Sequence, residues 1–440
     1  MKVTSQSVSN RERVLLIGVA VKRASRIPGV EAGVAERESL LELDELARSA
    51  GAKVAGSLLQ IRDAIDPATV VGRGKLEEIK IEAQMRDVPV VIFDRNLTPG
   101  QQRNIEEATD CRVIDRTQLI LDIFARHARS REGQLQVELA QLNYLLPRLT
   151  GRGVEMSRLG GKSGAMGGGI GMRGPGEQKL ETDRRRIRDR VRKIEQNIER
   201  VRRQRAVRRQ ARQAVPLGMV ALVGYTNAGK STLFNALTHA GVLTSGKMFA
   251  TLDPTIRAVR LPSNRKVLLS DTVGFIRDLP PGLIAAFRAT LEEVQEASLI
   301  LHVADVANPH HPEQDAEVEK VLAELGVADR PRLHVFNKLD LLSPEEAAAL
   351  RNGNGNVFVS ALTGAGLDEL LRRIDEAMPV DPKVRVTLHV PLGDGRTVAL
   401  VHACGRVLHS EVQDGHVCLD AEVPESLARR LRLTNVVVHS

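Results

Sequence analysis

The chain has 440 residues, 42% of them hydrophobic, and carries a formal net charge of +8. This length suggests about three domains with sizeable cores, and the positive charge favours a polyanionic partner. Aromatic residues make up only 2%, which argues against single-strand binding through bases stacked on aromatic side chains. The three cysteines lack metal-ligand spacing, and no apolar run is long enough to span a membrane. We expect a reduced, cytoplasmic protein that is monomeric when free, with peripheral membrane association left open.

Strands and helices alternate through residues 1–130. Short apolar runs predict strands at 13–21, 53–60, 88–94 and 111–115. Amphipathic stretches predict helices at 39–50, 75–85, 98–108 and 117–128. Ser39 is placed to cap the first of these helices. The alternation predicts a small parallel α/β domain.

The turn into the second helix is basic, since it reads Gly72-Arg73-Gly74-Lys75. It is either a second anion or nucleotide site at a helix N-terminus, or a tight turn with two solvated basic side chains. We favour the turn, because no full P-loop motif occurs there.

Residues 131–214 are predicted to form a helical hairpin. Leucines recur at three- and four-residue steps in 132–149, and apolar residues form a heptad-like seam in 179–212. Between them, 160–176 hold nine glycines in seventeen residues, a composition that cannot build a core. We expect two antiparallel helices with a flexible tip.

The second helix of this hairpin concentrates the positive charge. Residues 179–212 hold 15 Lys and Arg against 5 Asp and Glu, a local charge of +10 that exceeds the +8 of the whole chain. A solvated coiled-coil face is the plainer interpretation. The excess of basic residues beside a flexible basic tip favours RNA contact instead.

A phosphate-binding motif opens the next domain, predicted at 215–380. Gly224 to Ser231 fit G-x-x-x-x-G-K-[ST] between a strand-like run and an amphipathic helix. Backbone N–H groups of such a loop and the following helix N-terminus bind phosphates. Lys230 is placed for the β- and γ-phosphates, and Ser231 for Mg²⁺.

Three later strand ends predict which nucleotide binds. Asp271 and Gly274 form D-x-x-G, whose carboxylate reaches the Mg²⁺ shell and whose glycine N–H reaches a γ-phosphate. In the N-K-x-D of 337–340, Asp340 can accept hydrogen bonds from N1–H and the 2-amino group of guanine, which adenine lacks. Ser-Ala-Leu at 360–362 ends another strand, beside the base. Together these motifs predict GTP.

A switch threonine must place its hydroxyl on Mg²⁺. Thr251 is our choice and Thr255 its rival. Phe275 stands where Ras-type GTPases carry the glutamine that orients the attacking water. Whether or not Phe275 simply packs in the core, intrinsic hydrolysis should be slow, and another group or a partner must order the water.

We assign Lys230, Thr251 and Gly274 to catalysis and Ser231, Thr251 and Asp271 to the metal. The residues predicted to contact GTP or GDP with Mg²⁺ are Gly224, Tyr225, Thr226, Asn227, Ala228, Gly229, Lys230, Ser231, Thr232, Phe249, Ala250, Thr251, Leu252, Asp253, Asp271, Thr272, Val273, Gly274, Asn337, Lys338, Leu339, Asp340, Ser360, Ala361 and Leu362.

Residues 381–440 predict a small α+β domain. Its expected strands are 384–390, 405–412 and 435–439, and its expected helices are 396–403 and 424–431. Its scattered histidines lack ligand spacing and predict no chemistry.

The whole chain resembles the HflX-type ribosome-associated GTPases. The resemblance rests on Gly72 to Glu78 and Asp94 to Leu97, on Leu139 to Leu142, on the tip sequence Met172 to Glu177, and on the G-domain motifs. It implies an N-terminal α/β domain, a helical hairpin, a P-loop G domain and a small C-terminal domain. It also implies binding to rRNA of the large ribosomal subunit, splitting of stalled or stress-inactivated ribosomes in the GTP state, and ATP use by the N-terminal domain.

Two other functions stay open. One is a GTP-gated ribosome-binding or assembly scaffold with little turnover, which Phe275 favours. The other is an ATP-dependent rRNA remodeller driven by the N-terminal domain, in which Lys75 would matter to turnover and Asp340 would not.

Overall fold

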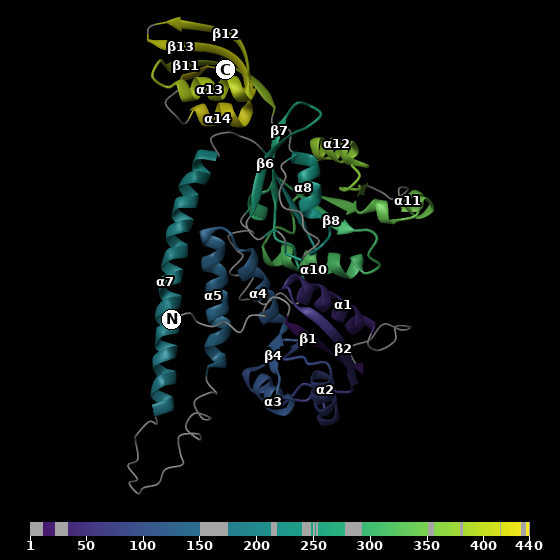
Figure 1. Cartoon of the computed structure of the whole chain (residues 1–440). Coiled ribbons are helices and arrows are strands. Elements are labelled where there is room, and N and C mark those ends of the chain that lie inside the picture. Colours follow the sequence, from purple (N-terminus) through teal and green to yellow (C-terminus); the bar gives the residue numbers. More distant parts are fainter. Residues whose placement is uncertain are drawn as a thin grey trace.

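The computed structural model describes residues 12–22, 34–149, 175–212, 218–239, 248–249, 251, 254–277, 293–350, 356–378, 382–413, 415–432 and 437–439 (Figure 1). The Gly-rich stretch at 160–174 and the predicted site residues Ala250, Leu252 and Asp253 lie outside these residues. Among the described helices, none has the length and apolar character needed to cross a membrane.

The N-terminal domain contains a parallel sheet, as predicted, and the described helices cover both of its faces. The strands lie in the order β2-β1-β3-β4. Their bounds are β1 Arg13–Val21, β2 Lys53–Arg62, β3 Val90–Phe93 and β4 Arg112–Asp115, and the helices are α1 Val34–Ser49, α2 Arg73–Met85, α3 Pro99–Thr109 and α4 Arg116–His127. Alternate residues of β1 face α1 with α4 on one side and α2 with α3 on the other. Burial on both faces explains why β1 is an unbroken apolar run.

The predicted cap at Ser39 was wrong. Helix α1 begins five residues earlier, at Val34, so Ser39 lies inside it and is buried. Its hydroxyl hydrogen-bonds to the carboxylate of Asp94 at the end of β3. The apolar stripe reaches only the inner turns of the helix, so periodicity could not locate its first turn.

The predicted helical hairpin is present. Helices α5 (Arg131–Arg148) and α7 (Pro175–Arg212) lie side by side (Figure 1). Leu142, Ile194 and Ile198 are buried between them, with further seam residues half-buried around them. Arg190 on α7 donates two hydrogen bonds, of 2.7 and 2.8 Å, to the carboxylate of Glu138 on α5. The seam sets the pairing of the two helices, and within 181–204, where the side chains are described, it leaves most basic residues of α7 exposed.

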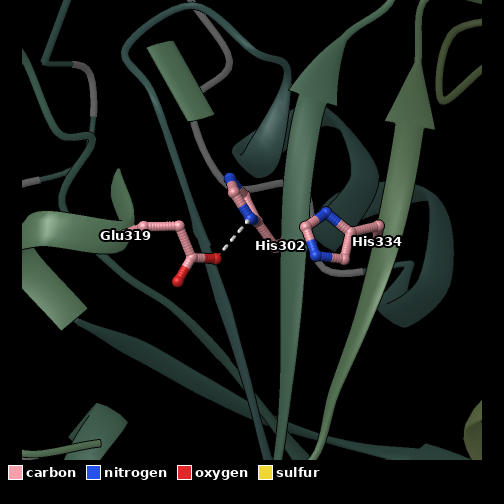
Figure 2. Close-up of side chains that lie close together, drawn as sticks. All are labelled: His302, Glu319 and His334. Atoms are coloured by element: carbon pink, nitrogen blue, oxygen red, sulfur yellow. Dashed lines mark ion pairs between the residues drawn. The ribbon is translucent and has the colours of Figure 1, made fainter. Parts of the chain in front are cut away.

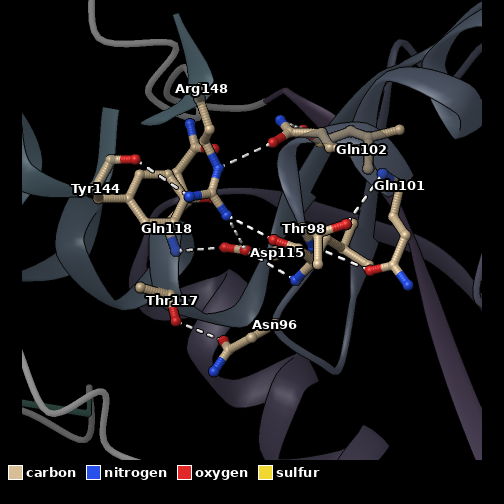
Figure 3. A network of polar contacts seen from close by, with 11 residues as sticks. Asn96, Thr98, Gln101, Gln102, Asp115, Thr117, Gln118, Tyr144 and Arg148 are labelled. Carbon is tan, nitrogen blue, oxygen red and sulfur yellow. Dashed lines mark hydrogen bonds and ion pairs between the residues drawn. The ribbon is translucent and has the colours of Figure 1, made fainter. Parts of the chain in front are cut away.

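The far end of α5 is clamped onto the N-terminal sheet. Figure 3 shows Arg148 reaching from α5 to the strand ends, where it donates to Asp115 Oδ2 at 3.0 Å and to Gln102 Oε1 at 3.1 Å. It also donates to the Leu97 carbonyl at 2.7 Å, and its guanidinium lies 3.5 Å from the ring centroid of Tyr144. Since Asp115 is fully buried, this ion pair fixes the arm to the domain beneath it.

The G domain contains a six-stranded sheet in the order β10-β9-β8-β5-β7-β6, in which only β6 is antiparallel to its neighbour. The strands are β5 Met219–Gly224, β6 Thr255–Arg260, β7 Lys266–Asp271, β8 Leu299–Asp305, β9 Arg332–Asn337 and β10 Val357–Phe358. The helices are α8 Lys230–Thr238, α10 His311–Glu324, η2 Leu339–Leu341, α11 Pro344–Leu350 and α12 Leu367–Ala377. Strand β6, helices α10, α11 and α12, and the short helix η2 were not predicted.

The C-terminal domain is an antiparallel sheet in the order β12-β13-β11-β14. Its elements are β11 Lys383–Pro391, α13 Gly395–Cys404, β12 Arg406–Gln413, β13 His416–Pro424, α14 Glu425–Arg432 and β14 Val437–His439. Strand β13 was missed, although it pairs with both β11 and β12. Its charged residues Asp420 and Glu422 alternate with a buried apolar face, the pattern of a half-buried strand.

Candidate functional site

Two glycines shape the loop between β5 and α8. Gly224 has a φ of +151°, and a Cβ there would lie 2.1 Å from the Val303 carbonyl oxygen. Gly229, immediately before α8, has a φ of +89°, and its Cβ would lie 2.2 Å from Asn337 Nδ2. These close approaches let the loop turn tightly over the sheet edge, with its backbone facing the space where phosphates bind in such motifs.

Lys230 is the first residue of α8, and its side chain reaches back into this loop. It is buried, and its Nζ donates to the carbonyls of Gly224 at 3.0 Å and Tyr225 at 2.6 Å. A Cβ on Gly274 would lie 3.0 Å from the same Nζ. The structure therefore brings the predicted phosphate lysine beside the predicted γ-phosphate glycine, from segments 44 positions apart in sequence.

The three residues predicted to hold the metal converge on one carboxylate. Asp271 Oδ2 accepts hydrogen bonds from Ser231 Oγ at 2.7 Å and Thr251 Oγ1 at 2.8 Å, and the two hydroxyls lie 2.8 Å apart. The other oxygen, Asp271 Oδ1, is buried without a hydrogen-bond partner among the described residues. Two hydroxyls beside a carboxylate with a free oxygen fit a hard cation such as Mg²⁺. Burial raises the pKa of Asp271, while the hydrogen bond from Ser231 and the charge of Lys230 act in the opposite direction.

Thr251 and its rival Thr255 lie in different environments. Thr251 is buried, and its hydroxyl belongs to the Asp271 cluster. Thr255 is the first residue of β6 and pairs with Asp271 through the strand register. This geometry favours Thr251 as the switch residue.

The expected guanine side is built from three segments. Asn337 Nδ2 donates to the Ala228 carbonyl at 2.9 Å, and its Oδ1 accepts from the Ala361 N–H at 2.9 Å. Asp340 Oδ1 accepts from Ser360 Oγ at 2.5 Å. Lys338, at a φ of +67°, pairs with Asp305. Asn337 thus holds the P-loop and the Ser-Ala-Leu segment together.

Phe275 packs in the core, as the plainer interpretation expected. It is buried in a cluster that also holds Phe249 and residues of α1 and α4. Its carbonyl accepts from the Thr226 N–H at 2.7 Å, and its N–H donates to the Gly224 carbonyl at 3.1 Å. Its side chain brings no polar group to the phosphate side of the loop.

The N-terminal domain contacts the P-loop directly, which sequence reasoning missed. The hydroxyl of Tyr225 donates to Glu42 Oε1 of α1 at 2.5 Å and accepts from the Arg277 N–H at 2.8 Å. Glu42 is paired with Arg116, which also binds Asp94 at 2.7 Å. Burial and the charge of Glu42 raise the pKa of Tyr225, so it remains a neutral donor. A contact between residues 183 positions apart leaves no local signal that could have revealed it.

The charge of Lys230 predicts a pH-dependent affinity for nucleotide. Burial lowers the pKa of Lys230 to about 8, while Asp271 acts in the opposite direction. Phosphates bind the protonated form, so affinity is full below this pKa and falls as pH rises through it. The affinity of the full chain for GDP should be about tenfold weaker at pH ~9 than at pH ~7. Fluorescent-nucleotide titration measures this, and a profile as flat as that of Lys230→Met would contradict it.

The chain matches known families over most of its length. A family described as GTP-binding GTPase N-terminal matches residues 37–125, and one described as GTP-binding GTPase Middle Region matches 127–212. A third, described as 50S ribosome-binding GTPase, matches 219–338. The chain is 47% identical over 397 residues to GTPase HflX of Caldanaerobacter subterraneus subsp. tengcongensis, with 90% of each chain covered. The chain belongs to the HflX GTPase family.

A second HflX relative agrees. GTPase HflX of Escherichia coli (strain K12) is 42% identical over 400 residues, covering 90% of this chain and 92% of the relative. A solved GTP-binding protein from Sulfolobus solfataricus in complex with GDP is 24% identical, with 83% of this chain and 98% of that chain covered and a TM-score of 0.42. Membership of the HflX family makes the chain a GTP hydrolase that uses guanine nucleotide with Mg²⁺, on a G domain of the ribosome-binding type.

Proposed function

We propose that this GTPase binds rRNA of the large ribosomal subunit through the arm formed by α5 and α7, and that its GTP-bound state dissociates stalled or inactive ribosomes. Hydrolysis then releases the factor. Lys230 binds phosphate, Ser231 and Thr251 bind Mg²⁺ with Asp271 in its outer shell, and Asp340 with Asn337 selects guanine. We place its work in the cytoplasm, with the chain monomeric when free.

The observation that carries the GTP dependence is the meeting of Thr251 with Ser231 on Asp271. Thr251 lies in the segment between α8 and β6, whereas Ser231 belongs to the P-loop. A metal with a γ-phosphate would hold the two segments together, and its loss on hydrolysis would release the switch. The ring centroid of the neighbouring Phe249 lies 4.5 Å from that of Phe124 on α4. Movement of the switch segment would therefore be transmitted to the N-terminal domain through this contact.

The proposed RNA contact rests on exposed charge along α7. Arg185, Arg188, Lys193 and Arg200 are exposed, and the described part of the chain places no carboxylate within ion-pair distance of them. Cations that are not neutralised by the protein itself remain available for phosphates. The family's description as 50S ribosome-binding supports a large-subunit partner.

The test is GTP hydrolysis with and without large ribosomal subunits at two salt concentrations. We expect slow hydrolysis by the free chain and a large stimulation that weakens as salt rises. Replacing Arg185 and Arg188 together with glutamine should weaken subunit binding about tenfold and flatten its salt dependence, since each lost phosphate contact removes about 0.7–0.9 from the slope. Arg372→Gln, on the surface of the G domain, is the matched control and should change neither.

An unchanged rate with subunits would sink this mechanism and favour the GTP-gated scaffold. If the double variant is stimulated by subunits as strongly as the unchanged chain, with the same salt dependence, the RNA contact does not lie on this face of α7.

A further inference from the structure

Two histidines and two carboxylates gather on the face of the G-domain sheet that α10 covers. His302 on β8 and His334 on β9 are direct partners in the strand register, so both project from the same face. Asp315 and Glu319 lie four residues apart on α10, on the side of the helix that meets them. Figure 2 shows the ring of His302 between the carboxylate of Glu319 and the ring of His334.

The ring of His302 is buried and poorly partnered. It is 0% exposed, and neither of its nitrogens makes a well-directed hydrogen bond within the described residues. Its Nε2 lies 3.1 Å from Asp315 Oδ1, and its Nδ1 lies 3.7 Å from Glu319 Oε1. A buried imidazole without well-made bonds is costly, which points to a ligand that would satisfy it.

The two carboxylates suit different roles towards His302. Asp315 can accept a hydrogen bond from Nε2–H of His302, which leaves the lone pair of Nδ1 on the side of Glu319. A metal-bound histidine usually donates its other N–H to a carboxylate in this way. One ligand atom from each of His302, His334 and Glu319 lies within 4.8 Å of the others.

We propose that His302, His334 and Glu319 bind a divalent transition metal of the zinc class, with Asp315 orienting His302 and water completing the shell. Two imidazole nitrogens and one carboxylate oxygen form a zinc-type ligand set. This site is separate from the nucleotide site and does not depend on the proposed function.

Small movements bring the ligands to bonding distance. Atoms around a tetrahedral zinc ion lie about 3.3 Å apart, so the side chains must close by about 1.5 Å at most. Glu319 is a long side chain, 40% exposed, and can make that movement.

Other cations share the carboxylates. Arg332 on β9 pairs with Glu319, and His311 Nδ1 lies 3.7 Å from Asp315 Oδ2. Arg332 donates to both carboxylate oxygens of Glu319, so a bound metal would take over one of these oxygens and leave Arg332 on the other. Bound metal would fasten α10 to β8 and β9 and raise the thermal stability of the G domain.

The test is titration of the full chain with Zn²⁺ by calorimetry, and with Co²⁺ by its visible absorption, after GDP and Mg²⁺ have filled the nucleotide site. We expect one additional site per chain and a rise in melting temperature. His334→Leu, which keeps an apolar strand residue, should weaken binding at least tenfold and abolish the cobalt spectrum.

Glu319→Gln repeats the test if His334→Leu fails to bind GDP and is therefore misfolded. His409→Ala removes an exposed histidine of the C-terminal domain and should bind zinc unchanged. Cys418→Ser tests the contact of 3.1 Å between Cys418 Sγ and His389 Nδ1 as a rival site. The proposal is overturned if the unchanged chain binds no zinc stoichiometrically, or if Cys418→Ser loses the site while His334→Leu and Glu319→Gln retain it.

Discussion

Asp340→Asn should bind GDP and GTP on the order of 10³-fold more weakly than the unchanged chain and should bind xanthine nucleotides better than guanine nucleotides. In the proposed complex the Asp340 carboxylate would accept two hydrogen bonds from guanine, whereas an asparagine would present an N–H donor to the 2-amino group and leave it unsatisfied. Xanthine carries an oxygen at that position, which accepts from the asparagine amide. Because Asp340 is already positioned by Ser360, the substitution should change recognition and leave the fold intact.

The change in base preference can be measured by letting guanosine and xanthosine diphosphates compete with a fluorescent nucleotide for the site. Ser360→Ala is the graded control, since it removes one hydrogen bond to Asp340 and should cost about 1 kcal/mol, roughly fivefold in affinity, without changing the preferred base. Equal GTP turnover by Asp340→Asn and the unchanged chain would contradict the guanine assignment.

Lys230→Met should lose about 3 kcal/mol of nucleotide affinity, roughly 150-fold, and all measurable GTP hydrolysis. Methionine keeps the length and the apolar portion of the side chain, so the buried position is filled. The substitution removes the ammonium group. In the free chain this group donates to the Gly224 and Tyr225 carbonyls, and on nucleotide binding it would donate to the phosphates instead. Single-turnover hydrolysis at saturating GTP separates the loss of catalysis from the loss of binding.

Lys75→Met is the matched comparison in the N-terminal domain. Lys75 lies in the first turn of α2, and its side chain is 12% exposed and pairs with the more exposed Glu78 at 2.8 Å. We expect GTP hydrolysis by this variant to be unchanged. Nucleotide hydrolysis that depends on Lys75 and not on Lys230 would favour the rival in which the N-terminal domain drives an RNA remodeller.

The features that sequence reasoning found share a strong local signal. Three features were found this way: the apolar run of β1, the heptad seam of α7 and the motif at 224–231. In each case the residues that form the feature are close together in the sequence, so a short window contains the whole pattern. The G-domain motifs also predicted which strand ends meet, because strand ends of a parallel sheet lie along one edge.

The features that it missed depend on residues far apart in the chain. Glu42 reaches Tyr225 only because α1 packs against the G domain, and a contact of this kind produces no repeating pattern in the sequence. His302 and His334 come together through the register of β8 with β9, which spacing alone cannot supply. Strand β6 is a different case: three of its six residues are exposed, so its apolar signal is weak.

The clamp of Arg148 makes the arm a lever. It joins the C-terminal end of α5 to the N-terminal sheet, and helices α1 and α4 of that domain share a core with Phe249 and Phe275. Helix α7 has 38 residues and is therefore about 57 Å long. A rotation of about 5° at its base would sweep its far end through about 5 Å, the rise of one helical turn. In the proposed mechanism, a small rearrangement around Thr251 would be amplified by the length of α7 into a displacement of several ångströms at the ribosome.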